Sequence, residues 1–167
     1  VEVALQVTNR GYETDDFLAI AKSSSGEHRL LIQVKHDISF TIENEKFKEV
    51  ISAFWKDYSN TSIFDKTRDK LIVVKNGLTK DERNHLKSLF NWAGNHATET
   101  DFISEVNRIK GKKDRLTVFR EVLKEANNNT VLTDKEIWKF LKCVDVLEYD
   151  FLNEGSVDKT YFLNLIK

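Results

Sequence analysis

Residues 15–36 read DDFLAIAKSSSGEHRLLIQVKH, and the expected sheet is organised around them. Two short apolar runs flank a Ser/Gly cluster, which is the pattern of a β-hairpin. We expect a pairing that sets Asp16 opposite Lys35 and Leu18 opposite Gln33. Because side chains alternate along a strand, Asp16, Gln33 and Lys35 then lie on one face, beside apolar neighbours.

These three polar groups suit chemistry on a phosphodiester. The Asp16 carboxylate and the Gln33 amide oxygen are hard ligands for Mg²⁺, which keeps several waters and usually takes only one or two protein carboxylates. Mn²⁺ can replace it. The Lys35 ammonium can orient an attacking water and offset charge on a phosphoryl group. The alternative is an ordinary strand end, with polar groups on a solvated face and a lysine that protects the edge.

An acid, a hairpin and then Gln-x-Lys resembles the PD-(D/E)XK nuclease superfamily in a D…QxK form. More narrowly, residues 15–18 (DDFL) and 32–36 (IQVKH) resemble the N-terminal nuclease domains of bacterial antiviral STAND/NACHT-type ATPases and of nucleotide-activated defence nucleases. Residues 144–156 are similar to the close of such a domain. The resemblance implies an α/β fold with a restriction-endonuclease-like mixed β-sheet flanked by helices.

The resemblance also implies an activity, which is magnesium-dependent endonucleolytic hydrolysis of DNA, double-stranded DNA above all, in antiviral defence. Asp16 and Gln33 would bind the metal and Lys35 would be the catalytic lysine, with Glu13 and Asp15 as further candidate metal ligands. Gln33 replaces the acid that is usual in the family, so the site carries one negative charge less. The alternative is a catalytically inactive nuclease-like module that binds DNA or another protein.

The elements around the hairpin give residues 1–97 the order of the restriction-endonuclease-like core. Residues 1–7 alternate like a strand with one buried face. Residues 47–58 have the apolar spacing of an amphipathic helix, which we expect to open near Thr41 or Asn44 and to close at residues 59–60. Residues 70–75 are nearly all apolar, as in a strand that helices cover on both faces. Residues 79–82 (TKDE) form a capping box that predicts another helix.

Residues 98–167 are expected to be a mainly helical extension with one late strand. A second capping box at residues 133–136 (TDKE) predicts a helix, and residues 144–150 alternate like a strand. Apolar residues return at helical spacing from Val157 to Ile166. We therefore expect one nuclease-like domain over residues 1–167.

The most basic stretch of the chain is RIKGKKDR, residues 108–115. We interpret it as a turn between two helices that contacts nucleic-acid phosphates. A solvated turn with no ligand is the alternative, because charge runs discriminate poorly. The candidate phosphate contacts are Lys110, Lys112, Lys113 and Arg115.

Composition limits how the chain can contact DNA and which cellular compartment it suits. The chain has 167 residues and a net charge of −1, so any DNA contact must rely on a local basic patch rather than on a global field. A single cysteine, Cys143, allows no disulfide and favours a reducing, cytoplasmic compartment. The sequence has neither a signal-peptide pattern nor an apolar run long enough to predict a membrane span.

The sequence also gives expectations about context. It begins inside an alternating run, so we expect it to be a fragment of a longer multidomain protein. The family resemblance implies a C-terminal NTPase or sensor module and makes a homo-oligomer plausible. No phosphate-binding Gly-rich loop occurs in these residues, so the NTPase is not encoded here.

Overall fold

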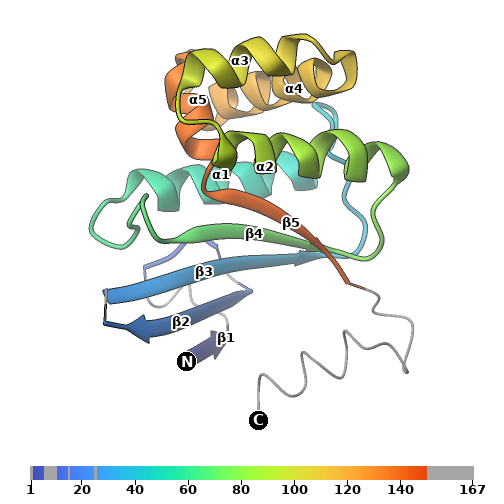
Figure 1. Ribbon diagram of the computed structural model, residues 1–167. Coiled ribbons are helices and arrows are strands. Elements are labelled where there is room, and N and C mark those ends of the chain that lie inside the picture. Colours follow the sequence, from blue (N-terminus) through green and yellow to red (C-terminus); the bar gives the residue numbers. More distant parts are fainter. Residues whose placement is uncertain (1, 6–10, 15, 25, 150–167) are drawn as a thin grey trace.

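The computed structural model describes residues 2–5, 11–14, 16–24 and 26–149. Figure 1 shows a twisted five-stranded β-sheet with the described helices stacked on one side of it. The strands lie in the sheet in chain order, from β1 to β5. The α/β class expected from the sequence is confirmed.

The sheet is mixed. Strands β1 (Glu2–Leu5), β2 (Phe17–Ser23) and β3 (Gly26–Lys35) form an antiparallel meander. Strands β4 (Lys70–Lys75) and β5 (Val144–Glu148) both run parallel to β3. The C-terminal ends of β3, β4 and β5 therefore lie at the same end of the sheet.

The hairpin forms, but its expected register is wrong by two residues. Leu18 pairs with Leu31 instead of Gln33, and the ladder closes at Ser23 and Gly26. The tight turn rests on Gly26, whose φ of 117° is readily adopted only by glycine. Because the shift is even, each side chain stays on the face that alternation predicts.

Helix α1 (Glu45–Ser59) is the crossover between the parallel strands β3 and β4. Of the two starts that the sequence allows, Thr41 and Asn44, the helix uses Asn44, whose side chain accepts the Phe47 amide at 2.9 Å. Its apolar stripe is buried against the sheet. The buried hydrophobic residues of α1 are Phe47, Val50, Ile51, Phe54 and Tyr58.

The capping box after β4 also forms. Thr79 donates its backbone amide to the Glu82 carboxylate at 2.8 Å, and the Thr79 hydroxyl accepts the Glu82 amide at 3.1 Å. The segment that follows is not a regular α-helix at first. It is a π-helix, η2 (Glu82–Lys87), that continues into α2 (Ser88–Asn95).

The remaining helices, α3 (Glu99–Asn107), α4 (Lys110–Ala126) and α5 (Asp134–Leu141), form an outer layer over α1 and α2. The second predicted capping box is present, since Thr133 and Glu136 each accept the backbone amide of the other. The late strand is β5. The helical spacing over residues 157–166 lies outside the described residues.

The core lies on the helical face of the sheet alone. It includes Leu18, Leu31, Leu71, Val73 and Val146 from the strands, together with the buried sides of the helices. Residues at the alternate strand positions do not belong to it. The prediction that helices cover both faces of β4 is thus wrong for the described helices, which all pack on one side (Figure 1).

Candidate functional site

Asp16 lies one residue before β2, and its carboxylate is fixed against β3. Oδ2 accepts the backbone amide of Val34 at 2.7 Å. Continuing the ladder from Phe17 and Ile32 places Asp16 beside Gln33. The carboxylate is therefore held at the backbone between the other two residues of the predicted motif, Gln33 and Lys35.

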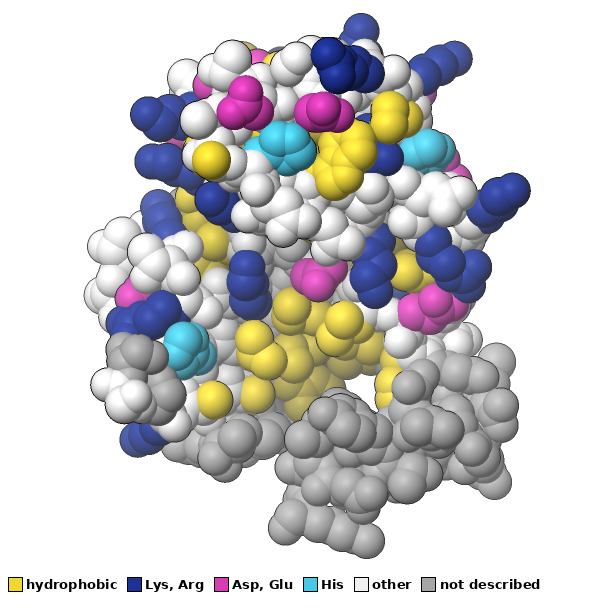
Figure 2. Space-filling view, viewed as in Figure 1, with side chains coloured by type: hydrophobic (Ala, Val, Ile, Leu, Met, Phe, Trp, Pro, Cys, Tyr) yellow, Lys and Arg dark blue, Asp and Glu magenta, His cyan; other side chains and the backbone are white. Residues whose placement is uncertain are grey.

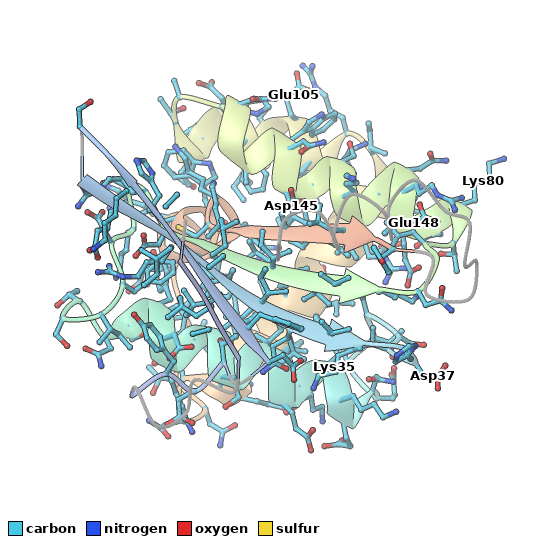
Figure 3. All side chains as sticks on the ribbon, turned by 90° about the horizontal axis from the view of Figure 1, so that it is seen from below. Lys35, Asp37, Lys80, Glu105, Asp145 and Glu148 are labelled. Atoms are coloured by element: carbon cyan, nitrogen blue, oxygen red, sulfur yellow. The ribbon has the colours of Figure 1, made fainter. Side chains whose placement is uncertain are left out.

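Gln33 and Lys35 share the face of β3 that carries Leu31 and packs toward the helices. Gln33 is 5% exposed, so its amide lies inside the fold. Lys35 is half-buried at the end of β3, and Figure 3 shows it there, close to α1. Within the described part of the chain its ammonium has neither an ion pair nor a hydrogen bond. Lys35 thus keeps its positive charge available to a ligand.

A buried carboxylate on α1 positions the loop before Asp16. Asp57 is 1% exposed, and its two oxygens accept the amides of Glu13 and Thr14, each at 2.8 Å. Sequence reasoning missed this contact. A signal was present, because Asp57 follows Val50 and Phe54 at the spacing of the apolar stripe, where a charged residue needs a partner.

The two other candidate ligands differ from Asp16. The Glu13 carboxylate forms an exposed ion pair with Lys56 at 3.3 Å, and it faces a cavity of about 400 Å³ along α1. That cavity is not lined by Asp16, Gln33 or Lys35. Asp15 lies outside the described residues.

The described residues offer a small donor set for a metal. No group of three Asp, Glu, His or Cys side chains is placed to hold an ion within the described part of the chain. The pair that the hairpin supplies is the Asp16 carboxylate and the neighbouring Gln33 amide. This pair fits Mg²⁺, which draws most of its remaining ligands from water and substrate phosphate.

Charged residues also lie at the C-terminal ends of the neighbouring strands. Lys35, Lys75 and Glu148 occupy adjacent positions at the ends of β3, β4 and β5. The Lys75 ammonium is 2.6 Å from Glu82, and both side chains are buried. Glu148 accepts from Arg83 at 2.6 Å and from the Leu78 amide at 3.0 Å. Lys75 and Glu148 thus each have a partner of opposite charge within the fold, whereas the Lys35 ammonium has none in the described part of the chain.

The basic stretch is only in part the turn that the sequence suggested: Arg108 and Ile109 lie between α3 and α4, whereas residues 110–115 form the start of α4. Lys112 points inward: it is 6% exposed, and its ammonium lies 4.2 Å from the centroid of the Trp92 ring. Burial lowers the pKa of Lys112. Arg115 binds the Asp81 carboxylate and the Phe40 carbonyl.

Lys110 and Lys113 differ from these two residues, because both are exposed on the first turn of α4. Of the four cations that the sequence singled out, two therefore make contacts inside the fold and two face solvent. A phosphate contact on this helix would depend on Lys110 and Lys113.

Comparison of the chain with protein-family models, with curated proteins and with solved structures found no match. None of the described helices combines the length and the apolar character needed to cross a bilayer.

Proposed function

We propose that this chain is a metal-dependent endonuclease domain that hydrolyses phosphodiester bonds in DNA, double-stranded DNA above all. The observation that carries the proposal is the hydrogen bond between the Asp16 carboxylate and the Val34 amide. This bond holds an acid against β3 between Gln33 and Lys35, the arrangement that a D…QxK site requires.

The residues of the hairpin would divide the chemistry between them. Asp16 and the Gln33 amide oxygen would hold Mg²⁺ or Mn²⁺, which supplies Lewis acidity toward a phosphoryl oxygen when bound. Lys35 would orient the attacking water and stabilise charge that develops on the phosphoryl group. Because Lys35 is half-buried, this charge acts in a medium less polar than water.

The arrangement of the strands gives further support. The antiparallel meander β1 to β3, the crossover α1 and the parallel strand β4 follow the element order of a restriction-endonuclease-like core. The proposal includes action as the effector of an antiviral defence protein, in the cytoplasm, with an NTPase or sensor module C-terminal to this domain and assembly into a homo-oligomer.

A second candidate is an inactive nuclease-like module that binds DNA or a protein partner. It is favoured by the burial of Gln33 at the position of the usual acid. The small number of carboxylates near Asp16 in the described part of the chain points the same way. This module would keep the fold and lack hydrolysis.

The test is cleavage of plasmid DNA by the purified protein in Mg²⁺ and in Mn²⁺. We expect Asp16→Asn and Lys35→Ala each to lower the rate by roughly 10²-fold or more, the usual effect of losing a group that stabilises the transition state. Asp37→Asn and Lys80→Ala are matched controls, because both residues are exposed and carry the same charges (Figure 3). The controls should cleave at the wild-type rate.

Two results would contradict the proposal, and melting temperatures control for a third. Cleavage that persists in both site variants would come from another nuclease in the preparation. DNA binding without cleavage would favour the inactive module. Loss of activity together with a lower melting temperature would mean that a variant is unfolded, so melting is measured for each protein, and Lys35→Arg serves as a second variant that keeps the charge.

A further inference from the structure

The sheet has a second apolar face, opposite the helices. The strand registers align its side chains in two adjacent rows. One row contains Phe17, Ile32, Ile72 and Asp145, and the next contains Val34, Val74 and Leu147. None of these side chains belongs to the core cluster. We call these two rows the outer face, and Figure 2 shows apolar side chains gathered over the sheet below the helical layer.

Six of the seven side chains in these two rows are apolar although no described helix packs on this face, and one of them, Ile72, is only 6% exposed. Leu147 is 43% exposed, and Leu30, at an alternate position of β3 on the same side, is 39% exposed. Parallel strands such as β3, β4 and β5 normally have both faces covered, because their crossovers place helices on each side. A covering segment is therefore expected here.

The chain itself supplies a segment that begins next to this face. The Tyr149 amide donates to the Lys75 carbonyl at 2.9 Å, so the β4–β5 ladder continues up to the start of residues 150–167. In the sequence of that segment, apolar residues recur at helical spacing. These residues are Val157, Tyr161, Phe162, Leu165 and Ile166, while Leu163 falls on the other side of such a helix.

The dimensions also agree. A helix over residues 157–166 would be about 15 Å long, at 1.5 Å per residue. Three strands side by side are about 14 Å wide. Residues 150–156 (DFLNEGS) can extend over roughly 23 Å, enough to turn the chain back across the sheet. The tether also gives the segment an effective concentration of about millimolar, which favours it over a partner in solution.

We propose that residues 157–166 form an amphipathic helix that packs its apolar side on the outer face, across β3, β4 and β5. The occupant of this face is thus a segment of the same chain. The proposal does not depend on nuclease activity, since it concerns the opposite side of the sheet from Gln33 and Lys35.

The experiment is hydrogen exchange on the full chain, read segment by segment. We expect the amides of residues 157–166 to exchange at least about tenfold more slowly than unstructured peptide amides. Leu165→Asp and Leu147→Asp, one on each side of the contact, should remove this protection. Thr160→Asp and Val131→Asp are matched controls, because Thr160 lies outside the apolar stripe and Val131 is a hydrophobic residue elsewhere that is 74% exposed.

Protection of β4 amides shows whether each variant keeps the sheet folded, and Leu165→Asp tests the contact without any change in the sheet. Exchange of residues 157–166 at the unstructured rate in the wild-type protein would overturn the proposal. So would protection that rises with protein concentration together with dimer formation in sedimentation, because a second copy would then be the occupant. Equal loss of protection in the controls would also contradict it.

Discussion

The buried carboxylate of Asp57 accepts the backbone amide of Thr14 at 2.8 Å and so ties the loop before β2 to helix α1. The loop carries Asp16 two residues further on. Asp57 is therefore a positioning residue for the proposed metal ligand. It contacts the backbone of the loop and needs no contact with substrate to affect the site.

Replacing Asp57 with Asn should weaken Mg²⁺ binding at the proposed site while the protein stays folded. An amide side chain accepts one of the two loop amides and opposes the other with its own NH₂ group. We expect stability to fall by about 1–3 kcal/mol, because one buried donor remains unsatisfied. We also expect a higher Mg²⁺ concentration for half-maximal plasmid cleavage. Asp37→Asn is the control, and an unchanged Mg²⁺ response in Asp57→Asn would show that the loop contact is only structural.

The Lys75–Glu82 ion pair predicts a larger effect on stability. The Lys75 Nζ lies 2.6 Å and 2.8 Å from the two carboxylate oxygens of Glu82, and both side chains are buried. Glu82→Ala should lower the free energy of unfolding by about 3–5 kcal/mol, because it leaves the Lys75 ammonium buried and unpaired. The double variant Lys75→Met, Glu82→Leu should be more stable than Glu82→Ala, since it removes both charges. Urea unfolding gives the free energy of unfolding of the wild type, of Glu82→Ala and of the double variant.

An exposed pair provides the contrast. Lys22 and Glu27 lie 3.4 Å apart with most of the lysine in water. Lys22→Ala should change the free energy of unfolding by less than about 1 kcal/mol. An equal loss in Lys22→Ala and Glu82→Ala would show that burial does not decide the strength of these pairs.

Local signals in the sequence predicted much of the fold. The strand over residues 70–75 stands out as a run of apolar residues, while the helix over residues 44–60 and the two capping boxes depend on contacts between residues close in the chain. Such contacts are visible as spacing and residue type. The register of the hairpin could not be predicted from spacing, because alternation is equally satisfied when β3 slides by two residues. The turn at Gly26 decides between the two pairings.

Contacts between distant residues explain the other differences. The sequence marks Lys112 and Arg115 as part of a basic run, but it cannot show that Trp92 and Asp81 lie beside them. The apolar run of β4 suggested helices on both sides, whereas the described helices lie on one. The candidate site shows the same limit. Its motif is local, while the Asp57 contact that positions it joins residues 43 positions apart.

Glu148 predicts a pH dependence of stability. Hydrogen bonds from Arg83 and from the Leu78 amide lower the pKa of Glu148 to about 2 from an ordinary value of 4.5. A carboxyl group whose pKa is lowered on folding stabilises the fold above its ordinary pKa, and this contribution is lost as the pH falls through the folded-state value. Wild type should therefore be more stable than Glu148→Gln above pH 4.5, and the difference should shrink toward pH 2.

Urea unfolding at a series of pH values measures this difference. Its size should be modest, because the Glu148 side chain is 38% exposed and solvent screens the ion pair. Glu105→Gln is a control, since Glu105 pairs with Arg108 on the surface of α3 at 3.5 Å. A Glu148→Gln difference that stays constant down to the lowest pH would mean that the hydrogen bonds do not depend on the charge.

The start of α4 indicates which cations would contact DNA under the proposed function. Lys110 and Lys113 face solvent, whereas Lys112 and Arg115 make contacts inside the fold. Lys110→Gln with Lys113→Gln should weaken DNA binding for every sequence tested. The slope of log affinity against log salt should become shallower by about 0.9 for each phosphate that the protein no longer neutralises. The melting temperature should not change.

Lys112→Met should give the opposite result, because it removes a buried cation from the face of Trp92 without removing a surface charge. The melting temperature should change while the salt slope stays the same. Lys135→Gln with Lys139→Gln is the matched control, since both lysines are exposed on α5 and the double variant removes the same charge. If the α5 variant weakens binding as much as the α4 variant, net charge alone governs the affinity, and α4 does not form a specific phosphate contact.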